Sequence, residues 1–248
     1  MKTAVVTGAA SGIGLACCED LVSSGWRVFG MDLSIDHLHT AGDRLGDCFI
    51  PIACDVSRSD EVSRAFATMQ SGTDTLDALI CSAGIFRTGP LLEMAESDFD
   101  ALFAVNAKGS WLAAKAALPL LAKSATAEAP ARIVFLGSIA SIRPKVGGGA
   151  YSASKTALAQ LARVLSVELA GRHILVNVVA PATVDTPMTQ RLKSDPRYRL
   201  SGMSPLGRVA QPSDVTPVIR FLLSSASNYV TGAILPVDGG TSAAYDPK

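Results

Sequence analysis

Short β-branched and apolar runs alternate with longer stretches of helical apolar spacing from one end of the chain to the other. Strands are expected at Thr3–Thr7, Arg27–Met31, Phe49–Cys54, Ala78–Cys81, Ile133–Leu136, Ile174–Val179 and Ala233–Val237. Helices are expected at Gly12–Ser23, Asp60–Gln70, Glu96–Asn106, Gly109–Lys123, Ser152–Ala170 and Pro212–Leu223. Strands that alternate with helices form mostly parallel sheets covered on both faces, so the pattern predicts a doubly wound α/β fold with a seven-stranded sheet.

Two of the expected helices are apolar on almost every side. They cover residues 111–121 and 157–169, in which Trp, Leu, Ala and Val predominate. Packing one helix face on the sheet does not use so many apolar positions. We therefore expect the second face to pack on another subunit, which makes the protein a homo-oligomer, either a dimer or a tetramer.

Composition narrows the possible partners. The chain has 248 residues, of which 48% are hydrophobic and 18% charged, and its 22 basic residues balance its 22 acidic ones. A zero net charge gives no reason to expect a nucleic acid or an anionic membrane as partner. No apolar stretch approaches the roughly 18 residues of a membrane span, and the first apolar run is too short for a signal peptide. The unbroken alternation predicts one domain over residues 1–248.

The cysteines and histidines show no metal or disulfide pattern. Cys17, Cys18, Cys48, Cys54 and Cys81 are irregularly spaced, which is typical of small buried side chains in a reducing compartment. We expect a cytoplasmic protein without a bound metal. The His37-x-His39 pair falls in a polar connection that is expected to be a solvated loop.

A glycine-rich turn joins the first strand to the first helix. It reads Thr7-Gly8-Ala9-Ala10-Ser11-Gly12-Ile13-Gly14. Glycines let a backbone turn sharply and approach a pyrophosphate, whose charge a helix N-terminus stabilises. At the first strand–helix junction of an α/β chain, this turn predicts a dinucleotide site at Gly8, Ser11, Gly12, Ile13 and Gly14.

Asp32 closes the second strand, 18 residues after Gly14. A carboxylate there can accept hydrogen bonds from both ribose hydroxyls of adenosine and would repel a 2′-phosphate. Leu33 and Ser34 follow without a cation, so NAD is expected rather than NADP. At the end of the third strand, Asp55 and Val56 could hold the adenine amino group and flank its ring. Asp55 could equally cap the helix that follows.

Tyr151 and Lys155 stand four residues apart at the start of a predicted helix, so both side chains project from one face. A phenol titrates near pH ~10 in water, and a nearby cation lowers its pKa. The pair is therefore a candidate acid/base group. The alternative is a buried tyrosine and a surface lysine with no chemical role.

Together, the G-x3-G-x-G turn, the YxxxK pair and Ser138, 13 residues before Tyr151, make the chain resemble the short-chain dehydrogenase/reductase family. The resembling positions run along the whole chain: Asp32, Asp55, Ala83-Gly84, Asn106, Ser138, Tyr151, Lys155, Asn177, Pro181, Thr186 and Asp238-Gly239-Gly240. The resemblance implies a Rossmann-type fold, with a nucleotide-binding half at about residues 1–105 and a catalytic and substrate half at about 106–248. It also implies a mobile lid at about residues 186–209.

The resemblance further implies a role for each site residue. Ser138 would hydrogen-bond the substrate oxygen, and Tyr151 would exchange a proton with it. Lys155 would lower the phenol pKa and hold the nicotinamide ribose, and Asn106 would keep a water that links Lys155 to solvent. The implied cofactor contacts also include Leu33, Ala83, Gly84, Tyr151, Pro181, Val184 and Thr186, of which Thr186 would bind the carboxamide. The implied activity is NAD(H)-dependent interconversion of a secondary alcohol and its ketone.

Two segments depart from the family pattern. Cys81-Ser82 stands where Asn-Asn is usual, and Pro181-Ala182 stands where Pro-Gly is usual. An alanine at 182 is unfavourable if the turn needs a positive φ. Neither departure touches the four catalytic positions Asn106, Ser138, Tyr151 and Lys155.

Two other functions were weighed. Ser152-Ala153-Ser154-Lys155 matches the S-x-x-K motif of penicillin-binding hydrolases, but the chain has no S-D-N or K-T-G motif. A catalytically silent NAD-binding regulator of the same fold is the stronger alternative. Its members would be expected to have lost a catalytic position, and here all four are present.

The substrate is less sharply defined by the sequence, and cyclic diols, polyols, hydroxy acids and hydroxysteroids all remain candidates. Gly147-Gly148-Gly149 forms a wall with little side-chain bulk, and Met188, Leu192 and Met203 in the lid indicate a partly apolar pocket. One of Arg87, Arg143 and Lys145 could anchor a substrate carboxylate, although surface charge explains all three.

Overall fold

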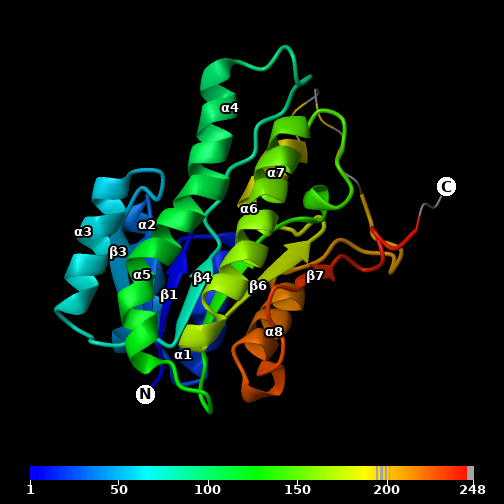
Figure 1. Ribbon diagram of the computed structural model, residues 1–248. Helices are drawn as coiled ribbons and strands as arrows, with labels where there is room; N and C mark the ends of the chain where they lie inside the picture. Colours follow the sequence, from blue (N-terminus) through cyan, green and yellow to red (C-terminus); the bar gives the residue numbers. More distant parts are fainter. Residues whose placement is uncertain (194, 196–197, 199, 201, 245–248) are drawn as a thin grey trace.

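A computed structural model describes residues 1–193, 195, 198, 200 and 202–244 of the chain (Figure 1). Seven strands form one sheet in the order β3-β2-β1-β4-β5-β6-β7, and all neighbouring pairs are parallel. The strands are β1 (Thr3–Thr7), β2 (Arg27–Asp32), β3 (Phe49–Ala53), β4 (Ala78–Cys81), β5 (Ala131–Leu136), β6 (Ile174–Pro181) and β7 (Ile234–Val237). The predicted doubly wound Rossmann-type fold is confirmed.

Helices cover both faces of the sheet. The α-helices are α1 (Gly12–Ser23), α2 (Ile35–Leu45), α3 (Ser59–Gln70), α4 (Glu96–Phe103), α5 (Ser110–Ser124), α6 (Gly149–Glu168), α7 (Pro187–Lys193) and α8 (Pro212–Leu222). A π-helix η2 (Ala104–Gly109) joins α4 to α5, and the 3-10 helices are η1 (Gly46–Cys48), η3 (Ile139–Ser141), η4 (Ala170–Arg172) and η5 (Ser225–Ser227). In the described part of the chain, no helix combines the length and apolarity that crossing a membrane requires.

The two apolar layers follow from the period of the strands. Successive side chains of a strand point to opposite faces, so Ile133 and Phe135 of β5 enter one core while Val134 and Leu136 enter the other. Residues of α3, α5 and α6 fill the first core, and residues of α1, α2 and α8 fill the second. Because both faces are buried, the strands are apolar at almost every position.

The structure corrects several expected boundaries. Residues 35–45, which contain His37 and His39 and were expected to be a polar loop, form α2, whose Leu38 and Ala41 are buried against the sheet. Its apolar residues Ile35, Leu38, Ala41 and Leu45 recur every three or four positions, a helical spacing, and polar residues cover its outer face. The segment expected as two helices, Glu96–Asn106 and Gly109–Lys123, is one helical path through η2. Cys48 is only half-buried, whereas the other four cysteines are buried as expected.

The carboxyl ends of β1 and β4 mark the crevice in which a ligand can bind. From β1 the chain winds toward β2 and β3, and from β4 it winds toward β5, β6 and β7. In a doubly wound sheet, the loops that leave two such strands diverge and open a crevice at this switch point. The glycine turn after β1 and the Ser82–Gly84 segment after β4 therefore face one another there.

Candidate active site

The glycine turn after β1 is packed so closely that it admits no side chain at two positions. Gly8 has a φ of +69°, and a Cβ on it would lie 2.7 Å from the backbone nitrogen of Ala83. A Cβ on Gly14 would lie 2.0 Å from the carbonyl oxygen of Gly8. The first turn of α1 therefore packs directly against the strand end, with the helix N-terminus facing the crevice. That geometry suits an anionic pyrophosphate.

A cavity of about 610 Å³ opens beside this turn. Most of the predicted cofactor residues line it, namely Gly8, Ser11, Gly12, Ile13, Asp32, Leu33, Asp55, Val56, Ala83, Gly84 and Thr186. Gly14 lies beneath the turn rather than at the surface of this nucleotide cavity. Pro181, Val184 and Tyr151 line a neighbouring cavity instead.

Asp32 is held at the edge of the nucleotide cavity by two backbone amides. The nitrogen of Ala10 donates to Oδ2 and that of Ser34 donates to Oδ1, each at 3.1 Å. The fixed carboxylate presents negative charge toward the cavity. Beside it, Nδ1 of His37 lies 3.0 Å from Oγ of Ser34, and both residues line the cavity. His37 was not predicted as a cavity residue, because α2, which places it there, was expected to be a loop.

Asp55 also lines the nucleotide cavity, but it does not cap α3. Its Oδ1 accepts hydrogen bonds from the backbone nitrogen and the hydroxyl of Ser57, at 2.9 and 2.7 Å, and the N-cap of α3 is Arg58. The capping role considered for Asp55 is therefore wrong. Its contact with adenine stays a prediction.

Ser138 and Tyr151 meet at the carboxyl end of the sheet. Ser138 follows β5 and caps η3, since its Oγ accepts a 3.1 Å hydrogen bond from the nitrogen of Ala140. Tyr151 lies in the first turn of α6, and the nearby Ser138 side chain favours its phenolate form. Both residues line a second cavity, of about 160 Å³. The predicted serine–tyrosine pair is thus assembled from segments that are separate in the fold.

Lys155 is buried one helical turn after Tyr151. Its Nζ donates a 2.7 Å hydrogen bond to the carbonyl oxygen of Leu136 and lies 5.9 Å from the centroid of the Tyr151 ring. Burial disfavours the ammonium and lowers the pKa of Lys155 from 10.5 to about 8.

Burial acts on the phenol in the opposite direction. It raises the pKa of Tyr151 to about 12, and the hydrogen bond with Ser138 opposes this rise while the charge of Tyr198 adds to it. Lys155 is not among the groups that shift this pKa. The lowering of the phenol pKa by Lys155 stays a prediction.

Asn106 lies in the π-helix η2 and ties three segments together. Its Oδ1 accepts a 2.8 Å hydrogen bond from the nitrogen of Ile85, and its Nδ2 donates to the carbonyl oxygen of Ile85 and to Oγ of Ser154, both at 3.0 Å. A Cβ on Gly84 would lie 3.2 Å from Oδ1 of Asn106 and 3.5 Å from Nζ of Lys155. Asn106 and Lys155 therefore approach one another across Gly84. The side-chain amide is used in structural bonds.

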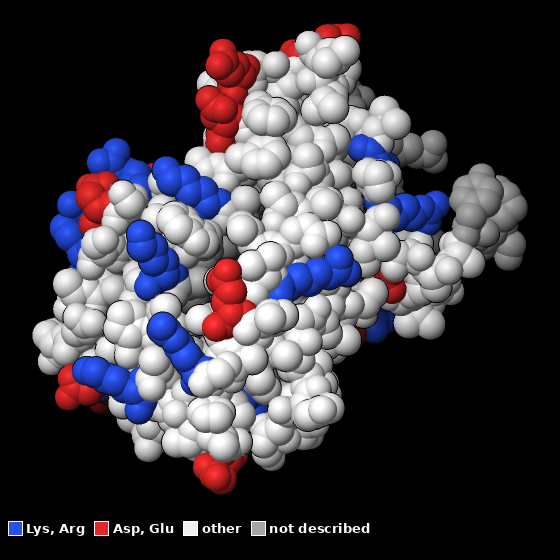
Figure 2. Space-filling model, in the orientation of Figure 1, with Lys and Arg blue, Asp and Glu red and all other residues white. Residues whose placement is uncertain are grey.

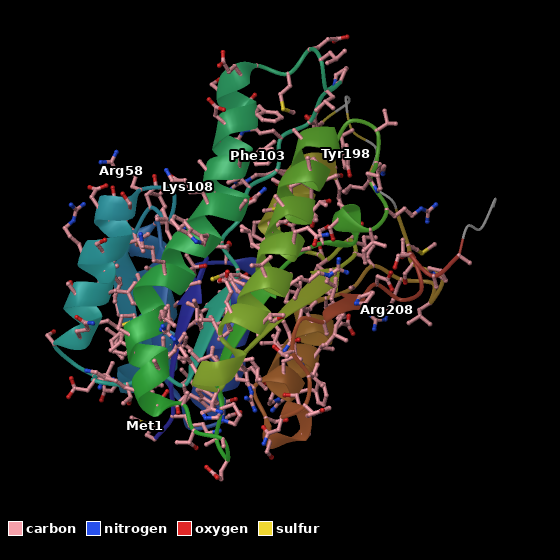
Figure 3. The ribbon with its side chains drawn as sticks, in the orientation of Figure 1. Met1, Arg58, Phe103, Lys108, Tyr198 and Arg208 are labelled. Atoms are coloured by element: carbon pink, nitrogen blue, oxygen red, sulfur yellow. The ribbon has the colours of Figure 1, made fainter. Side chains whose placement is uncertain are left out.

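The second cavity has an aromatic wall that the sequence did not reveal. The ring of Phe86 packs 4.4 Å from that of Tyr151, and the ring of Tyr198 packs 4.9 Å from Phe86, between centroids. Figure 3 shows Tyr198 beside the N-terminal end of α6. A Cβ on Gly148 would lie 3.1 Å from Cζ of Phe86 and 3.5 Å from Cε2 of Tyr198. The missing side chain at this glycine therefore leaves room for the two rings, as the predicted wall of small residues indicated.

Residues of the expected lid divide between the cavity and the surface. Met188 and Leu192 line the second cavity as predicted. Met203 does not, and 70% of its surface is exposed, so its predicted place in the pocket is wrong. Residues 194, 196, 197, 199 and 201 of that predicted lid lie outside the described residues.

The three cations considered as substrate anchors occupy different places. Arg143 and Lys145 line the second cavity. Nη1 of Arg143 donates to the carbonyl oxygen of Thr241 at 2.8 Å, and Nζ of Lys145 lies 4.8 Å from the centroid of the Tyr198 ring. Arg87 pairs with Asp98 at 3.1 Å, between Nε and Oδ1, and does not line the cavity.

The two cavities adjoin. Ile13, Thr186 and Met188 border both of them. Cγ2 of Thr186 lies 3.2 Å from the position of a Cβ on Gly12, so the segment after β6 closes directly over the glycine turn. Ala182, which replaces the usual glycine after Pro181, does not have a positive φ, so the substitution carries no backbone strain.

The comparisons with known proteins agree with this geometry. The family described as "Enoyl-(Acyl carrier protein) reductase" matches residues 8–242. The chain is 34% identical to 3-oxoacyl-[acyl-carrier-protein] reductase FabG of Thermotoga maritima, covering 96% of this chain and 97% of that protein. It is 37% identical to galactitol 2-dehydrogenase (L-tagatose-forming) of Cereibacter sphaeroides, with 96% and 93% covered.

Solved structures are similar over nearly the same length. The 3-ketoacyl-(acyl-carrier-protein) reductase of Brucella melitensis, complexed with NADH, has a TM-score of 0.89 at 26% identity, covering 97% of this chain and 98% of that one. The RhlG/NADP complex of Pseudomonas aeruginosa has a TM-score of 0.89 at 32% identity, covering 97% and 96%. These relatives are oxidoreductases, and none is an S-x-x-K hydrolase. The chain therefore belongs to the short-chain dehydrogenase/reductase family.

Proposed function

We propose that this protein interconverts a secondary alcohol and its ketone with NAD(H). The observation that carries the proposal is the junction of the two cavities. Ser138 and Tyr151 line the smaller cavity, the glycine turn lines the larger one, and Ile13, Thr186 and Met188 border both. A substrate carbinol held by the hydroxyls of Ser138 and Tyr151 would therefore face a dinucleotide bound in the adjoining nucleotide cavity.

The residues of the larger cavity fit a dinucleotide. The glycine turn leaves room for a pyrophosphate at the N-terminus of α1, where backbone amides and the helix dipole stabilise its charge. Asp32 would hold the adenosine ribose, Lys155 the nicotinamide ribose, and Thr186 the carboxamide. When bound, the dinucleotide supplies the hydride acceptor or donor.

The protein's part in the reaction is positioning and proton transfer. Ser138 holds the substrate oxygen, and Tyr151 takes its proton during oxidation or returns one during reduction. The buried phenol needs a route for that proton. Because the pKa of Lys155 is lowered to about 8, this lysine can gain or lose a proton near neutral pH. We assign Asn106 to holding a water between Lys155 and solvent.

The preference for NAD rests on Asp32. Its carboxylate is fixed by two backbone amides, so it cannot turn away from a 2′-phosphate without losing both bonds. Charge repulsion and the loss of ribose hydrogen bonds both disfavour NADP. The relatives give no single answer, since the structure from Brucella melitensis contains NADH and that of RhlG contains NADP.

A screen of reduction rates tests the proposal. NAD and NADP would each be offered with secondary alcohols of several classes, namely cyclic diols, polyols, hydroxy acids and sterols. We expect turnover with at least one class and a kcat/KM for NAD at least tenfold above that for NADP. Equal use of NADP would overturn the cofactor assignment. Dinucleotide binding without turnover of any alcohol would favour the silent regulator instead.

We also infer a homo-oligomer, from apolar side chains left exposed on the helices α5 and α6. Trp111 is 38% exposed, Val164 55% and Val167 78%. Figure 2 shows that the charged side chains on this face are separated by wide uncharged areas. Such surface is typical of subunit contacts. Sedimentation should give a dimer or tetramer at micromolar concentration, and a monomer would remove this inference.

A further inference from the structure

The second cavity carries the Ser138 and Tyr151 hydroxyls, an aromatic wall and two cations at its rim. We propose that it binds a secondary alcohol or ketone with a compact, ring-sized apolar body and an acidic group. This assignment rests on the proposed function and adds the substrate class. It is argued from the size of the cavity, its aromatic wall, its engaged hydroxyls and its two cations.

Size and wall define the apolar body. The cavity measures about 160 Å³, and Ile13, Pro181 and Thr186 on its wall are assigned to the cofactor, so the space left for a substrate admits only a compact body. Phe86 and Tyr198 pack against one another at 4.9 Å and present one aromatic surface next to Tyr151. Met188 and Leu192 complete the apolar walls. A flat or ring-shaped body makes the largest contact with such a wall.

The wall is held in place by contacts outside the catalytic pair. Gly148 has no Cβ, which would otherwise lie 3.1 Å from Phe86. Oγ1 of Thr88 donates to a carboxylate oxygen of Asp195, and the nitrogen of Tyr198 donates to the carbonyl oxygen of Asp195 at 3.2 Å. Tyr198 is therefore tied to the loop that carries Phe86. The aromatic surface is built by the protein before any substrate arrives.

Two further hydroxyl groups of the cavity are engaged with the protein's own backbone. Oγ of Ser152 donates to the carbonyl oxygen of Gly148 at 2.9 Å, and Oγ1 of Thr189 donates to that of Val184 at 2.6 Å. Their hydrogens are committed to the backbone. Neither hydroxyl therefore has a hydrogen to donate to a substrate hydroxyl, which reduces what this side of the cavity offers a polyol.

Arg143 and Lys145 supply the cationic rim. The 3-10 helix η3 joins Ser138 directly to Arg143, whose nitrogen donates to the carbonyl oxygen of Ile139 at 2.7 Å, so the reacting end and the rim lie on one short turn. Lys145 lies over the ring of Tyr198, at the edge of the aromatic wall. Charged hydrogen bonds to a carboxylate are stronger than neutral ones, and they would orient the ring with its carbinol toward Tyr151.

The reaction on such a substrate balances without another reactant. In oxidation the carbinol carbon loses a hydride to the oxidised dinucleotide, and its oxygen loses a proton through Tyr151 to solvent. A ketone and the reduced dinucleotide form, and the acidic group keeps its charge throughout. The anion therefore serves binding and orientation only.

A matched pair of probes tests the anionic preference. The substrates are 3-hydroxycyclohexanecarboxylate and its neutral carboxamide, which differ in charge but hardly in shape. We expect kcat/KM for the acid to exceed that for the amide at least about tenfold, mainly through KM. Arg143→Gln and Lys145→Gln should each reduce this ratio. Arg87→Gln, which removes a nearby cation outside the cavity, should leave it unchanged.

Binding of unreactive analogues separates this proposal from the proposed function. Calorimetry with benzoate and benzamide measures the anion preference of the intact protein without any turnover. Tighter binding of benzoate by about tenfold, lost in Arg143→Gln and kept in Arg87→Gln, supports the acidic class even if no alcohol is oxidised. Equal binding of the two analogues, or equal kcat/KM for the acid and the amide, would overturn it while leaving alcohol oxidation intact.

Discussion

The ammonium of Lys155 donates a 2.7 Å hydrogen bond to the backbone carbonyl oxygen of Leu136, the last residue of β5. Ser138 follows two residues later, so the same strand end positions the lysine and the serine. Burial lowers the pKa of this lysine to about 8. The lysine is thereby fixed to the sheet and able to exchange its proton near neutral pH.

The lowered pKa of Lys155 predicts how stability changes with pH. Native Lys155 loses its proton above about pH 8, whereas in the unfolded chain it does so above its ordinary value of 10.5. Between these values the unfolded state binds more protons, so the free energy of unfolding rises with pH. Below pH 8 the lysine is protonated in both the native and the unfolded state, so it adds no pH dependence to the free energy of unfolding.

Lys155→Met should remove that rise. Between pH 7 and pH 10 the wild type should gain about 2 to 3 kcal/mol relative to the variant. Urea unfolding of both proteins at each pH gives this difference, and groups common to both cancel. The comparison ends at pH 10, because above the ordinary pKa of 10.5 the lysine loses its proton in the unfolded chain as well and the gain levels off. Parallel curves for the two proteins would show that Lys155 titrates as in water.

Gly8→Ala separates close packing from backbone strain when it is compared with Gly25→Ala. Both glycines have a positive φ, of +69° and +78°, but a Cβ on Gly25 meets nothing within 4 Å while one on Gly8 meets Ala83. Gly25→Ala should cost about 1 kcal/mol and leave NAD binding unchanged. Gly8→Ala should cost about 1 to 3 kcal/mol more and weaken NAD binding at least tenfold. Denaturation and calorimetry measure the two effects, and equal losses would contradict this packing account.

Asp32→Ala should shift the cofactor preference toward NADP. The variant loses the two ribose hydrogen bonds and the charge that repels a 2′-phosphate, so the ratio of kcat/KM for NADP to that for NAD should rise at least about tenfold. Asp36→Ala is the matched control, because this exposed carboxylate on α2 does not line the nucleotide cavity. A comparable shift in the control would mean that general surface charge, and not Asp32, sets the preference.

Asn106→Ala should reduce both stability and activity. The side chain is fully buried and makes three hydrogen bonds, so its loss should lower the free energy of unfolding by about 2 to 4 kcal/mol. It should also lower kcat, because Lys155 is close by across Gly84.

Asn177→Ala provides the control for that variant. Asn177 is also buried and bonds to Val230 and Ala233, at 2.8 and 3.0 Å, away from both cavities. Its loss should lower stability by a similar amount and leave kcat unchanged at a temperature where both variants are folded. If kcat fell equally in both, the effect of Asn106 would be structural only.

The sheet could be predicted because its strands carry their own signal. Thr3–Thr7 and Ala78–Cys81 match the expected bounds, and the other strands differ only at their ends. A strand buried on both faces is a short apolar run rich in β-branched residues, whereas the apolar helices of this chain are longer and rich in Ala and Leu. The helix α2 was not predicted although Ile35, Leu38, Ala41 and Leu45 follow helical spacing, because polar residues separate these few apolar positions.

The site was predictable where it follows local motifs and unpredictable where it depends on distant segments. The glycine turn and the Tyr151–Lys155 pair lie within single segments. The contact of Phe86 with Tyr198 joins residues 112 positions apart in the sequence, and nothing local to either ring indicates it. The hydrogen bond from Lys155 to Leu136 could not be predicted either, because its acceptor is a backbone carbonyl oxygen, which every residue has.

Replacing Tyr151 by Phe tests the central claim most directly. The variant keeps the ring that packs on Phe86 and loses only the hydroxyl, so folding and dinucleotide binding should be unchanged. Turnover of the best secondary alcohol from the screen should fall by about 10²-fold or more, the range expected for a lost proton-transfer group. Wild-type rates in Tyr151→Phe, with NAD still bound, would contradict the assignment of Tyr151 as the acid/base group.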